Sequence, residues 1–292
     1  MTISLDNDFV VRYARPPAQT TLDRAISLHR NVRDVLGETD YLTLLQGSYK
    51  NDTALADMND VDIVAIVRNP PVTSFWSEVD WARIFSTIES KLAGDSRYQG
   101  KWKRHDKCIT LDTGVNIDIV PAVPGRDADV DPIEIYSWGR GRSRKNWPRI
   151  HYENAAKKSA ATSGTFKQAV RLFKNWARCH FGDQKVAPSY YFECLIYSLP
   201  DKLFTGELAD VFVALSEDIL VRYGGGFSAT YTLSRVGGEG DLFTSAEWDI
   251  DRFRRLRSQL TDSLVHAKVA VRELDLTRSR AAWRMAFAGQ AS

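Results

Sequence analysis

Leu45-Gln46-Gly47-Ser48-Tyr49 and, eleven positions further, Asp60-Val61-Asp62-Ile63 form the stretch from which the fold can be argued. In an extended strand successive side chains alternate between faces, so the two aspartates project on one side while Val61 and Ile63 enter the core on the other. Like charges so close together repel unless a cation lies between them, and carboxylate oxygens suit Mg²⁺ or Mn²⁺. The pair therefore predicts a metal site.

The surroundings of the Asp-x-Asp triplet decide how it is interpreted. Alone, such a triplet is more often a polar strand edge or turn than a site. Apart from Asp62, however, residues 61–67 are apolar and mostly β-branched, as in a buried strand, where an unpaired charge is costly. A second strand over residues 115–120, closed by Pro121, sets Asp118 between apolar neighbours. Asp118 is thus predicted as a third carboxylate beside the first two, in a site for two metal ions.

The Gly47-Ser48 dipeptide is predicted to be a phosphate-binding turn. Glycine lets backbone N–H groups approach a phosphate closely, and the Ser48 hydroxyl adds a donor without bulk. As an isolated dipeptide it would indicate an ordinary turn. Its position between a strand and the Asp-x-Asp strand favours the phosphate-binding interpretation.

The order of these motifs resembles that of the DNA polymerase β-like nucleotidyltransferase superfamily. More narrowly, Gln46-Gly47-Ser48-Tyr49 with Thr53, Asp60-Val61-Asp62 and Ile117-Asp118-Ile119-Val120-Pro121 resemble the bacterial cGAS/DncV-like nucleotidyltransferases (CD-NTases). Those enzymes make cyclic oligonucleotide signals in the antiphage defence called CBASS. One departure is Asp52-Thr53, where family members often carry Gly-Thr.

The resemblance implies a reaction and its cofactors. A ribose hydroxyl of one nucleotide would attack the α-phosphate of another in line, and pyrophosphate would leave. Two Mg²⁺ or Mn²⁺ ions would be held by three catalytic carboxylates, those of Asp60, Asp62 and Asp118. Repeated rounds from nucleoside triphosphates, ATP and GTP foremost, would give a cyclic di- or trinucleotide. A cyclic GMP-AMP isomer is the leading expectation, and it would activate a separately encoded effector protein.

The second half of the chain adds candidate nucleotide contacts. Residues 166–177 have helical apolar spacing with Lys174 near their end, and Pro188 with Ser189 gives a start signal for another apolar helix. Read alone, Lys174 is a solvated helix lysine and Tyr190 a core aromatic. By resemblance, Lys174 and Ser189 contact the donor triphosphate and Tyr190 stacks on a base. The implied nucleotide-binding residues are Gln46, Gly47, Ser48, Lys174, Ser189 and Tyr190.

Length and periodicity predict two lobes. The 292 residues, 43% of them hydrophobic, are enough for two adjoining cores. Strand and helix patterns mix up to about residue 150, and helical periodicity dominates afterwards. We therefore expect an α+β fold: a polymerase β-like catalytic lobe with an N-terminal helix over residues 1–150, a mainly helical nucleotide-binding lobe over residues 151–292, and an active site in the cleft between.

The charge balance bears on partners. With 39 basic and 37 acidic residues the net charge is +2, which disfavours a chain that coats nucleic acid nonspecifically, and no DNA or RNA activator is implied. Two basic clusters are interpreted as solvated surface, with the alternative that the second lines the triphosphate or acceptor cleft. The first comprises Lys101, Lys103, Arg104, His105 and Lys107, and the second Arg140, Arg142, Arg144, Lys145 and Arg149.

Three scattered cysteines predict a reducing compartment, and neither a membrane-spanning run nor a signal peptide is evident, so we expect a cytoplasmic protein without membrane contact. Two other functions stay open. The same fold can add nucleotides to an RNA 3′ end or to a protein or small-molecule hydroxyl. A degenerate module that only senses nucleotides is disfavoured, because all three acids are present.

Overall fold

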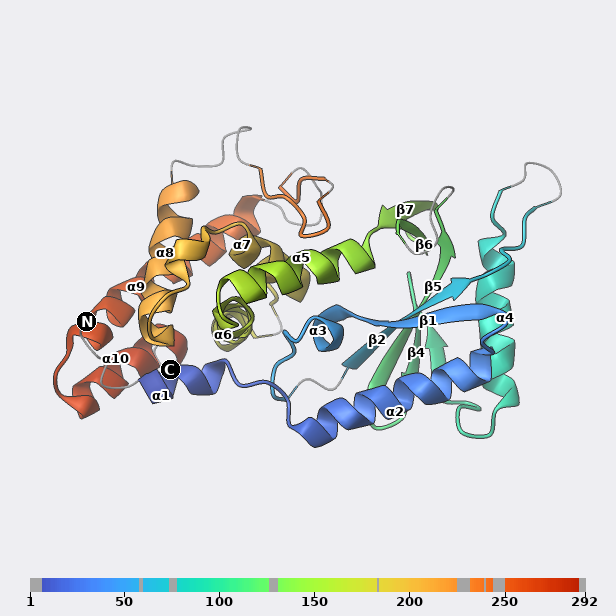
Figure 1. Ribbon diagram of the computed structural model, residues 1–292, viewed down its shortest axis with the longest axis horizontal. Coiled ribbons are helices and arrows are strands. Elements are labelled where there is room, and N and C mark those ends of the chain that lie inside the picture. Colours follow the sequence, from blue (N-terminus) through green and yellow to red (C-terminus); the bar gives the residue numbers. More distant parts are fainter. Residues whose placement is uncertain are drawn as a thin grey trace. The chain divides into compact units, whose positions relative to one another are not determined.

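The computed structural model describes residues 7–57, 60–73, 78–125, 131–182, 184–224, 232–238, 240–243 and 250–288. The chain divides into two compact units, Pro17–Tyr152 and Met1–Pro16 with Glu153–Ser292. The described part of the first unit is built on a β-sheet, and that of the second consists mainly of helices (Figure 1). The predicted α+β class is confirmed.

Seven strands of the described residues form one mixed sheet. Its order is β1-β2-β5-β4-β3, with β6 paired to β5 and β7 paired to β6. The strands are β1 (Tyr41–Gln46), β2 (Asp60–Val67), β3 (Trp102–Arg104), β4 (Ile109–Asp112), β5 (Asn116–Pro124), β6 (Ile133–Ser137) and β7 (Arg142–Asn146). Only the pairing of β2 with β5 is parallel among these, and it brings together the two strands that carry the predicted acids.

Helices α2 (Gln19–Leu36) and α4 (Trp81–Gly94) cover one face of the sheet. The side chain of Asp80 caps α4 by accepting a hydrogen bond of 3.0 Å from the Arg83 N–H. The apolar side chains of α4 recur at helical spacing and pack against the odd-numbered residues of β2. That face is therefore a closed core, and the even-numbered acids of β2 lie on the other one.

Strand β5 does not end at Pro121, as the sequence analysis predicted, but continues to Pro124. Proline lacks an N–H and usually interrupts a central strand. Here β5 pairs with β4 through Ile119 and with β6 from Ala122 onward, so Pro121 lies where the neighbour on that side changes. No ladder hydrogen bond to β4 or β6 is needed from this residue, which explains why a proline fits.

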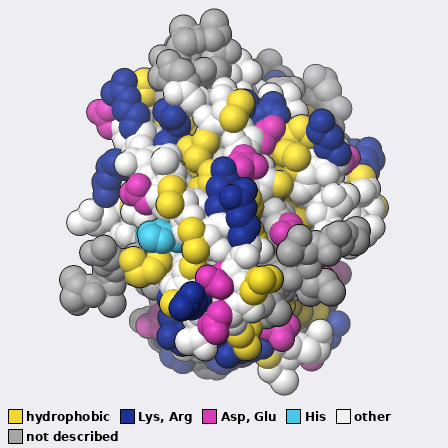
Figure 2. Space-filling model, turned by 90° about the vertical axis from the view of Figure 1, so that its left-hand side faces the viewer, with side chains coloured by type: hydrophobic (Ala, Val, Ile, Leu, Met, Phe, Trp, Pro, Cys, Tyr) yellow, Lys and Arg dark blue, Asp and Glu magenta, His cyan; other side chains and the backbone are white. Residues whose placement is uncertain are grey.

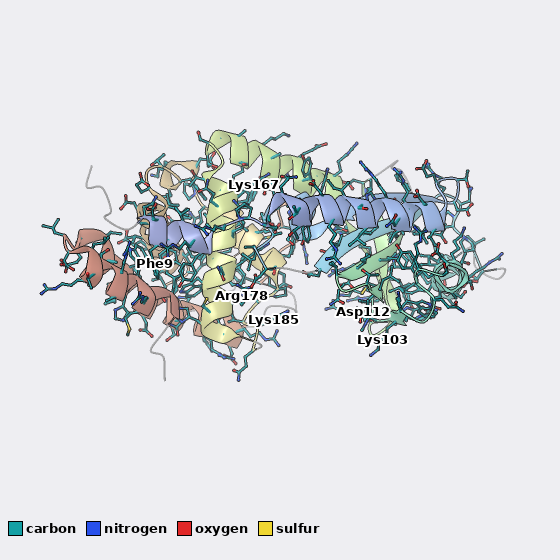
Figure 3. All side chains as sticks on the ribbon, turned by 90° about the horizontal axis from the view of Figure 1, so that it is seen from below. Phe9, Lys103, Asp112, Lys167, Arg178 and Lys185 are labelled. Atoms are coloured by element: carbon teal, nitrogen blue, oxygen red, sulfur yellow. The ribbon has the colours of Figure 1, made fainter. Side chains whose placement is uncertain are left out.

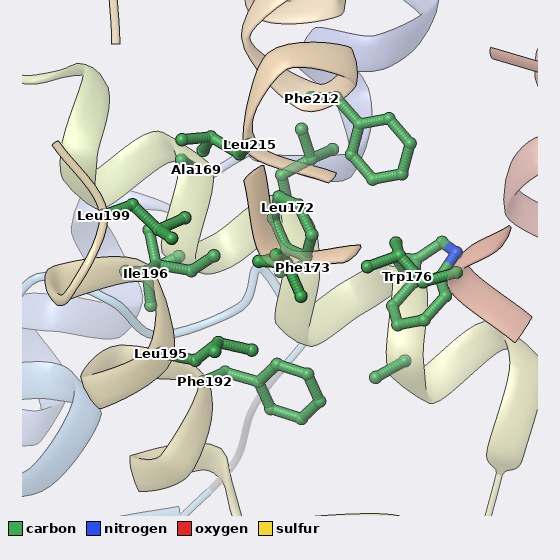
Figure 4. Close-up of a cluster of buried hydrophobic side chains, with 14 of the residues drawn as sticks. Ala169, Leu172, Phe173, Trp176, Phe192, Leu195, Ile196, Leu199, Phe212 and Leu215 are labelled. Atoms are coloured by element: carbon green, nitrogen blue, oxygen red, sulfur yellow. The ribbon is translucent and has the colours of Figure 1, made fainter. Parts of the chain in front are cut away.

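The helical unit has its own core. Its helices are α1 (Asn7–Tyr13), α5 (Pro148–Ala161, whose first residues belong to the sheet unit), α6 (Thr165–Phe181), α7 (Ser189–Tyr197), the short 3₁₀ helix η1 (Asp201–Leu203), α8 (Leu208–Arg222), α9 (Ile250–Arg272) and α10 (Leu276–Ala288). Phe173 and Trp176 of α6 pack with Phe212 of α8 and Leu195 of α7, and all four are buried (Figure 4). On the face shown in Figure 2, basic and acidic side chains are interspersed with apolar ones, in keeping with the near-neutral net charge.

Residues 7–16 pack with the helical unit, whereas the predicted boundary grouped them with the first lobe. The buried Arg171 of α6 donates a hydrogen bond of 2.7 Å to the Ala14 carbonyl, and Asn175 donates one of 3.0 Å to the Tyr13 carbonyl. The N-terminal helix expected in the sheet unit is α2. No helix among the described residues is long and apolar enough to span a membrane.

Candidate active site

The Gly-Ser turn lies directly against the first pair of acids. Strands β1 and β2 are antiparallel, and Gln46 is the register partner of Asp62. Gly47 then begins the short helix α3 (Gly47–Lys50) with φ of 69°, a conformation that favours glycine. A Cβ on Gly47 would lie 1.9 Å from Oδ2 of Asp62. Only glycine therefore allows the backbone of the turn to approach this carboxylate so closely.

The predicted acids project from one face of the sheet. The parallel register of β2 and β5 pairs Asp62 with Asp118, and pairs Asp60 with Asn116. All three carboxylates are half-buried, while Val61 of β2 is buried in the core on the opposite face. The alternation predicted from the sequence is thus present. Among the described residues, no three His, Cys, Asp or Glu side chains are grouped closely enough to hold a metal ion.

Two further side chains lie near Asp118, Thr110 of β4 and Cys108 directly before that strand, and neither was predicted from the sequence as part of the site. Thr110 is its register partner, and the Thr110 hydroxyl donates a hydrogen bond of 2.5 Å to Oδ1 of Asp118. The sulfur of Cys108 lies 3.9 Å from the same hydroxyl. Burial, and then the charge of Asp118, raise the pKa of the Cys108 thiol to about 11, so this cysteine is protonated at neutral pH.

The polar residues after the Gly-Ser turn contact the start of α5. The Asn51 side-chain nitrogen lies 3.0 Å from Nε2 of His151, and the Lys50 ammonium lies 4.3 Å from the ring centroid of Tyr152. The first turn of α5 is itself held by Asp131, which accepts a hydrogen bond of 2.7 Å from the Ile150 N–H. These contacts join the residues that follow the Gly-Ser turn to the start of α5.

The departure at Asp52 has a structural counterpart. Asp52 adopts φ of 54°, in the left-handed region where glycine is favoured and aspartate is tolerated. The adjacent Thr53 is 1% exposed, and its N–H donates a hydrogen bond of 2.9 Å to the Ser48 carbonyl. The glycine that the family resemblance implies at this position would fit the backbone conformation found here.

The candidates on the helices differ in accessibility. Lys174 of α6 is buried, and its ammonium lies 2.6 Å from Oε1 of Glu193. Ser189 is exposed at the first position of α7. Tyr190 is partly buried against the helical core, where its hydroxyl is hydrogen-bonded with Cys194 and Arg235, and burial raises the pKa of this hydroxyl. The nucleotide contacts of all three residues stay predictions.

The two basic clusters meet around one carboxylate. Asp106 accepts hydrogen bonds from the Ser137 hydroxyl at 2.9 and 3.0 Å and from the Gly139 N–H at 2.6 Å. The Gly139 N–H, the Ser137 hydroxyl and the positive charges of Lys107 and Arg140 all lower the pKa of Asp106. Residues about thirty positions apart in the sequence are thereby joined in one basic region.

The chain is similar to several known proteins. A family model described as the cGAS/DncV-like nucleotidyltransferase C-terminal helical domain matches residues 153–264. The chain is 30% identical over 286 residues to a cyclic UMP-AMP synthase of Rhodothermus marinus (strain SG0.5JP17-172), covering 86% of this chain and 94% of the relative. It is 28% identical over 231 residues to the cyclic dipyrimidine nucleotide synthase CdnE of Legionella pneumophila, covering 67% and 77%.

The fold is similar to solved structures as well. The structure of Rhodothermus marinus CdnE c-UMP-AMP synthase with Apcpp and Upnpp superposes with a TM-score of 0.70 at 27% identity, over 87% of this chain and 94% of that one. The match to the cyclic UMP-AMP synthase extends over nearly the whole relative, so it includes the sheet unit with its acids as well as the helical unit. The chain belongs to the cGAS/DncV-like nucleotidyltransferases.

Proposed function

We propose that the protein is a metal-dependent nucleotidyltransferase that joins and cyclises nucleoside triphosphates into a cyclic di- or trinucleotide, releasing pyrophosphate. The observation that carries the proposal is the register pair of Asp62 and Asp118, with Asp60 on the same face and Gly47 against Asp62. The synthase names of the relatives support the cyclisation. The established family membership supports the transfer reaction itself.

The chemistry of the donor set suits a hard divalent cation, although the three carboxylates as placed are not grouped closely enough to hold one. Asp60, Asp62 and Asp118 offer carboxylate oxygens from neighbouring strands, the ligands that Mg²⁺ and Mn²⁺ prefer. Ions bound there would neutralise charge on the triphosphate and make the acceptor hydroxyl more acidic. Thr110 holds Asp118 in place through its hydrogen bond. The backbone of the turn at Gly47 offers N–H groups to the donor phosphates.

The identity of the product has two candidates. The first is a cyclic GMP-AMP isomer, which we expect from the family resemblance. Since the relatives described above are named for cyclic UMP-AMP and for cyclic dipyrimidine nucleotides, a cyclic dinucleotide that contains UMP is the second candidate. We propose further that the product activates a separate effector protein in antiphage defence, as the family resemblance implies.

Transfer to an RNA 3′ end or to a protein or small-molecule acceptor is the alternative reaction. A long phosphate backbone needs many cations along its path, and the net charge of +2 offers little general attraction for RNA. The relatives named as cyclic nucleotide synthases also favour small acceptors.

The test incubates the purified protein with all four nucleoside triphosphates and Mg²⁺ or Mn²⁺, followed by phosphatase treatment and mass spectrometry. Phosphatase-resistant products that disappear in the Asp60→Ala, Asp62→Ala double variant would support the proposal, and their masses would give bases and ring size. Linear, phosphatase-sensitive products, or label transferred to added RNA, would favour the alternative reaction. Omission of the metal should abolish every product.

A further inference from the structure

Strand alternation divides the basic residues of β3 between the two faces of the sheet. Arg104 faces α4, where its guanidinium donates to both carboxylate oxygens of Glu89 at 2.5 and 2.6 Å and lies 5.7 Å from the ring centroid of Trp138. Lys103 is the register partner of Thr110, so its side chain leaves the opposite face. That is the face from which the acids project.

One row of register partners crosses the sheet on this face. It consists of Gln46, Asp62, Asp118, Thr110 and Lys103. Adjacent strands lie about 4.8 Å apart, so β3, two strands beyond β5, places the backbone of Lys103 about 10 Å from that of Asp118. Strand β3 ends the main strand order, and Figure 3 shows Lys103 at the outer margin of the sheet.

The charge of Lys103 is available to a ligand. The side chain is exposed, and within the described parts of the chain it makes no ion pair or hydrogen bond. Its neighbour Arg104, by contrast, is ion-paired with Glu89. Lys145 of β7 also differs from Lys103. It is the register partner of Glu134, and its side chain projects from the face of the sheet that α4 covers.

The order of groups along the row defines a direction for the reaction, if the proposed function holds. The Gly-Ser turn beyond Gln46 would hold the donor triphosphate, and the acids would lie at its α-phosphate. In an in-line transfer the attacking hydroxyl and the leaving pyrophosphate are on opposite sides of that phosphorus atom. The acceptor nucleotide therefore approaches from the side of β4 and β3.

We propose that Lys103 binds the 5′-phosphates of the acceptor nucleotide. A lysine ammonium is a compact point charge suited to a flexible phosphate chain, and Lys103 lies at the end of the row from which the acceptor arrives. In the first transfer the acceptor keeps its own triphosphate, because the donor α-phosphate is linked to the acceptor hydroxyl and only the donor loses pyrophosphate. The linear product then carries that triphosphate beside Lys103 until it turns over for ring closure.

The test separates donor from acceptor by chemistry. A 2′,3′-dideoxynucleoside triphosphate has no ribose hydroxyl and acts only as donor, while a nucleoside α,β-methylene triphosphate cannot lose pyrophosphate and acts only as acceptor. We expect Lys103→Gln to raise KM for the methylene acceptor about tenfold, the loss of one charge-assisted contact. In the same variant, KM for the donor should change far less from its wild-type value. The same holds for KM of a nucleoside 5′-monophosphate acceptor.

Two matched variants complete the experiment. Lys145→Gln removes one positive charge from the other face and should leave all KM values near wild type, and Lys103→Arg should restore most of the acceptor affinity. An unchanged KM for the methylene acceptor, or equal increases for donor and acceptor, would overturn the assignment of Lys103. A wild-type protein that forms no dinucleotide from natural triphosphates would instead overturn the proposed function, and the inference with it.

Discussion

The acids on the sheet and the lysine on the helices are held in opposite ways. Asp62 and Asp118 are half-buried register partners whose immediate contacts include a glycine turn and a threonine hydroxyl. The side chain of Lys174 is 2% exposed and ion-paired with Glu193. A strand fixes where its side chains project through alternation alone, whereas a helix residue depends on what packs around it. The position of the acids therefore follows from the strands, while that of Lys174 depends on its ion pair with Glu193.

The largest effect should come from the sheet. We expect Asp62→Asn to lower kcat/KM for cyclic product by about a thousandfold or more, because the charge that would bind the metal is lost while the shape is kept. Phosphatase-resistant product, quantified by mass spectrometry, is the measurement. Asp34→Asn, an exposed carboxylate on α2, is the matched control and should retain wild-type activity. Near-normal activity of Asp62→Asn would contradict the assignment of the acids.

The buried ion pair should dominate stability in the helical unit. Lys174→Met leaves the Glu193 carboxylate buried without its cation, and we expect the free energy of unfolding to fall by about 3 kcal/mol. Adding Glu193→Leu should recover most of this loss in urea denaturation. If Lys174 also binds the triphosphate, as the resemblance implies, the double variant regains stability but not activity. Recovery of both would show that the lysine is structural only.

Two glycines with positive φ allow the effect of backbone strain to be separated from the effect of contact with Asp62. Gly47→Ala would place a methyl group onto the Asp62 carboxylate, and we expect kcat/KM to fall about a hundredfold, as for a catalytic group displaced by an ångström. Gly141→Ala shares the positive φ, at 59°, but no other atom lies within 4 Å of its added Cβ. That control should lose some stability and no activity. Similar kinetics for both variants would show that backbone strain alone explains the effect.

The hydrogen bond to Asp118 should have an intermediate effect. Thr110→Val keeps the shape and removes the hydroxyl, so we expect about a tenfold loss of activity and weaker binding of Mn²⁺ by calorimetry. Thr110→Ser, which keeps the hydroxyl, should restore both values. A loss of thermal stability in Thr110→Val without a change in Mn²⁺ affinity would show that the hydroxyl serves only the fold.

The smallest effect is a pH dependence shared by both units. Burial lowers the pKa of His29 in α2 and of His180 in α6 below the ordinary value of 6.5. The unfolded chain then binds protons more readily, so the stability that these neutral rings contribute is present above pH 6.5 and is lost as the pH falls through their folded pKa values. Thermal unfolding between pH 7.5 and 5 should show the decline. His29→Gln and His180→Gln should each flatten it, and an unchanged slope in both would contradict this origin.

The sequence predicted local features and the approach of the Asp118 strand to the Asp60–Asp62 strand, but not the contacts that depend on register. Alternation placed Asp60 and Asp62 on one face because it needs only the strand period. The partnership of Thr110 with Asp118 depends on the register between strands, which no local pattern encodes. For the same reason the prediction that β5 ends at Pro121 is wrong, since only the arrangement of β4 and β6 shows that the missing N–H of this proline is not needed there.

The basic clusters illustrate the same limit. The sequence indicates each cluster as a run of charges. Only the folded sheet shows that Asp106 joins them through hydrogen bonds with Ser137 and Gly139. The division of Lys103 and Arg104 between faces follows from the strand period once β3 is known to be a strand. In a segment of three residues with two of them charged, the hydrophobic pattern is too short to indicate a strand.

Pro121 also has a consequence for how the sheet can grow. Pro121 has no N–H, so neither β4 nor β6 would gain a hydrogen bond from that group by extending across it. The pairing with β4 ends before this residue, and the pairing with β6 begins after it. The proline thus marks the boundary between two ladders on one strand. The ladder that aligns Asp118 with Thr110 ends at Ile119, two positions before this proline, and the ladder to β6 begins just after it.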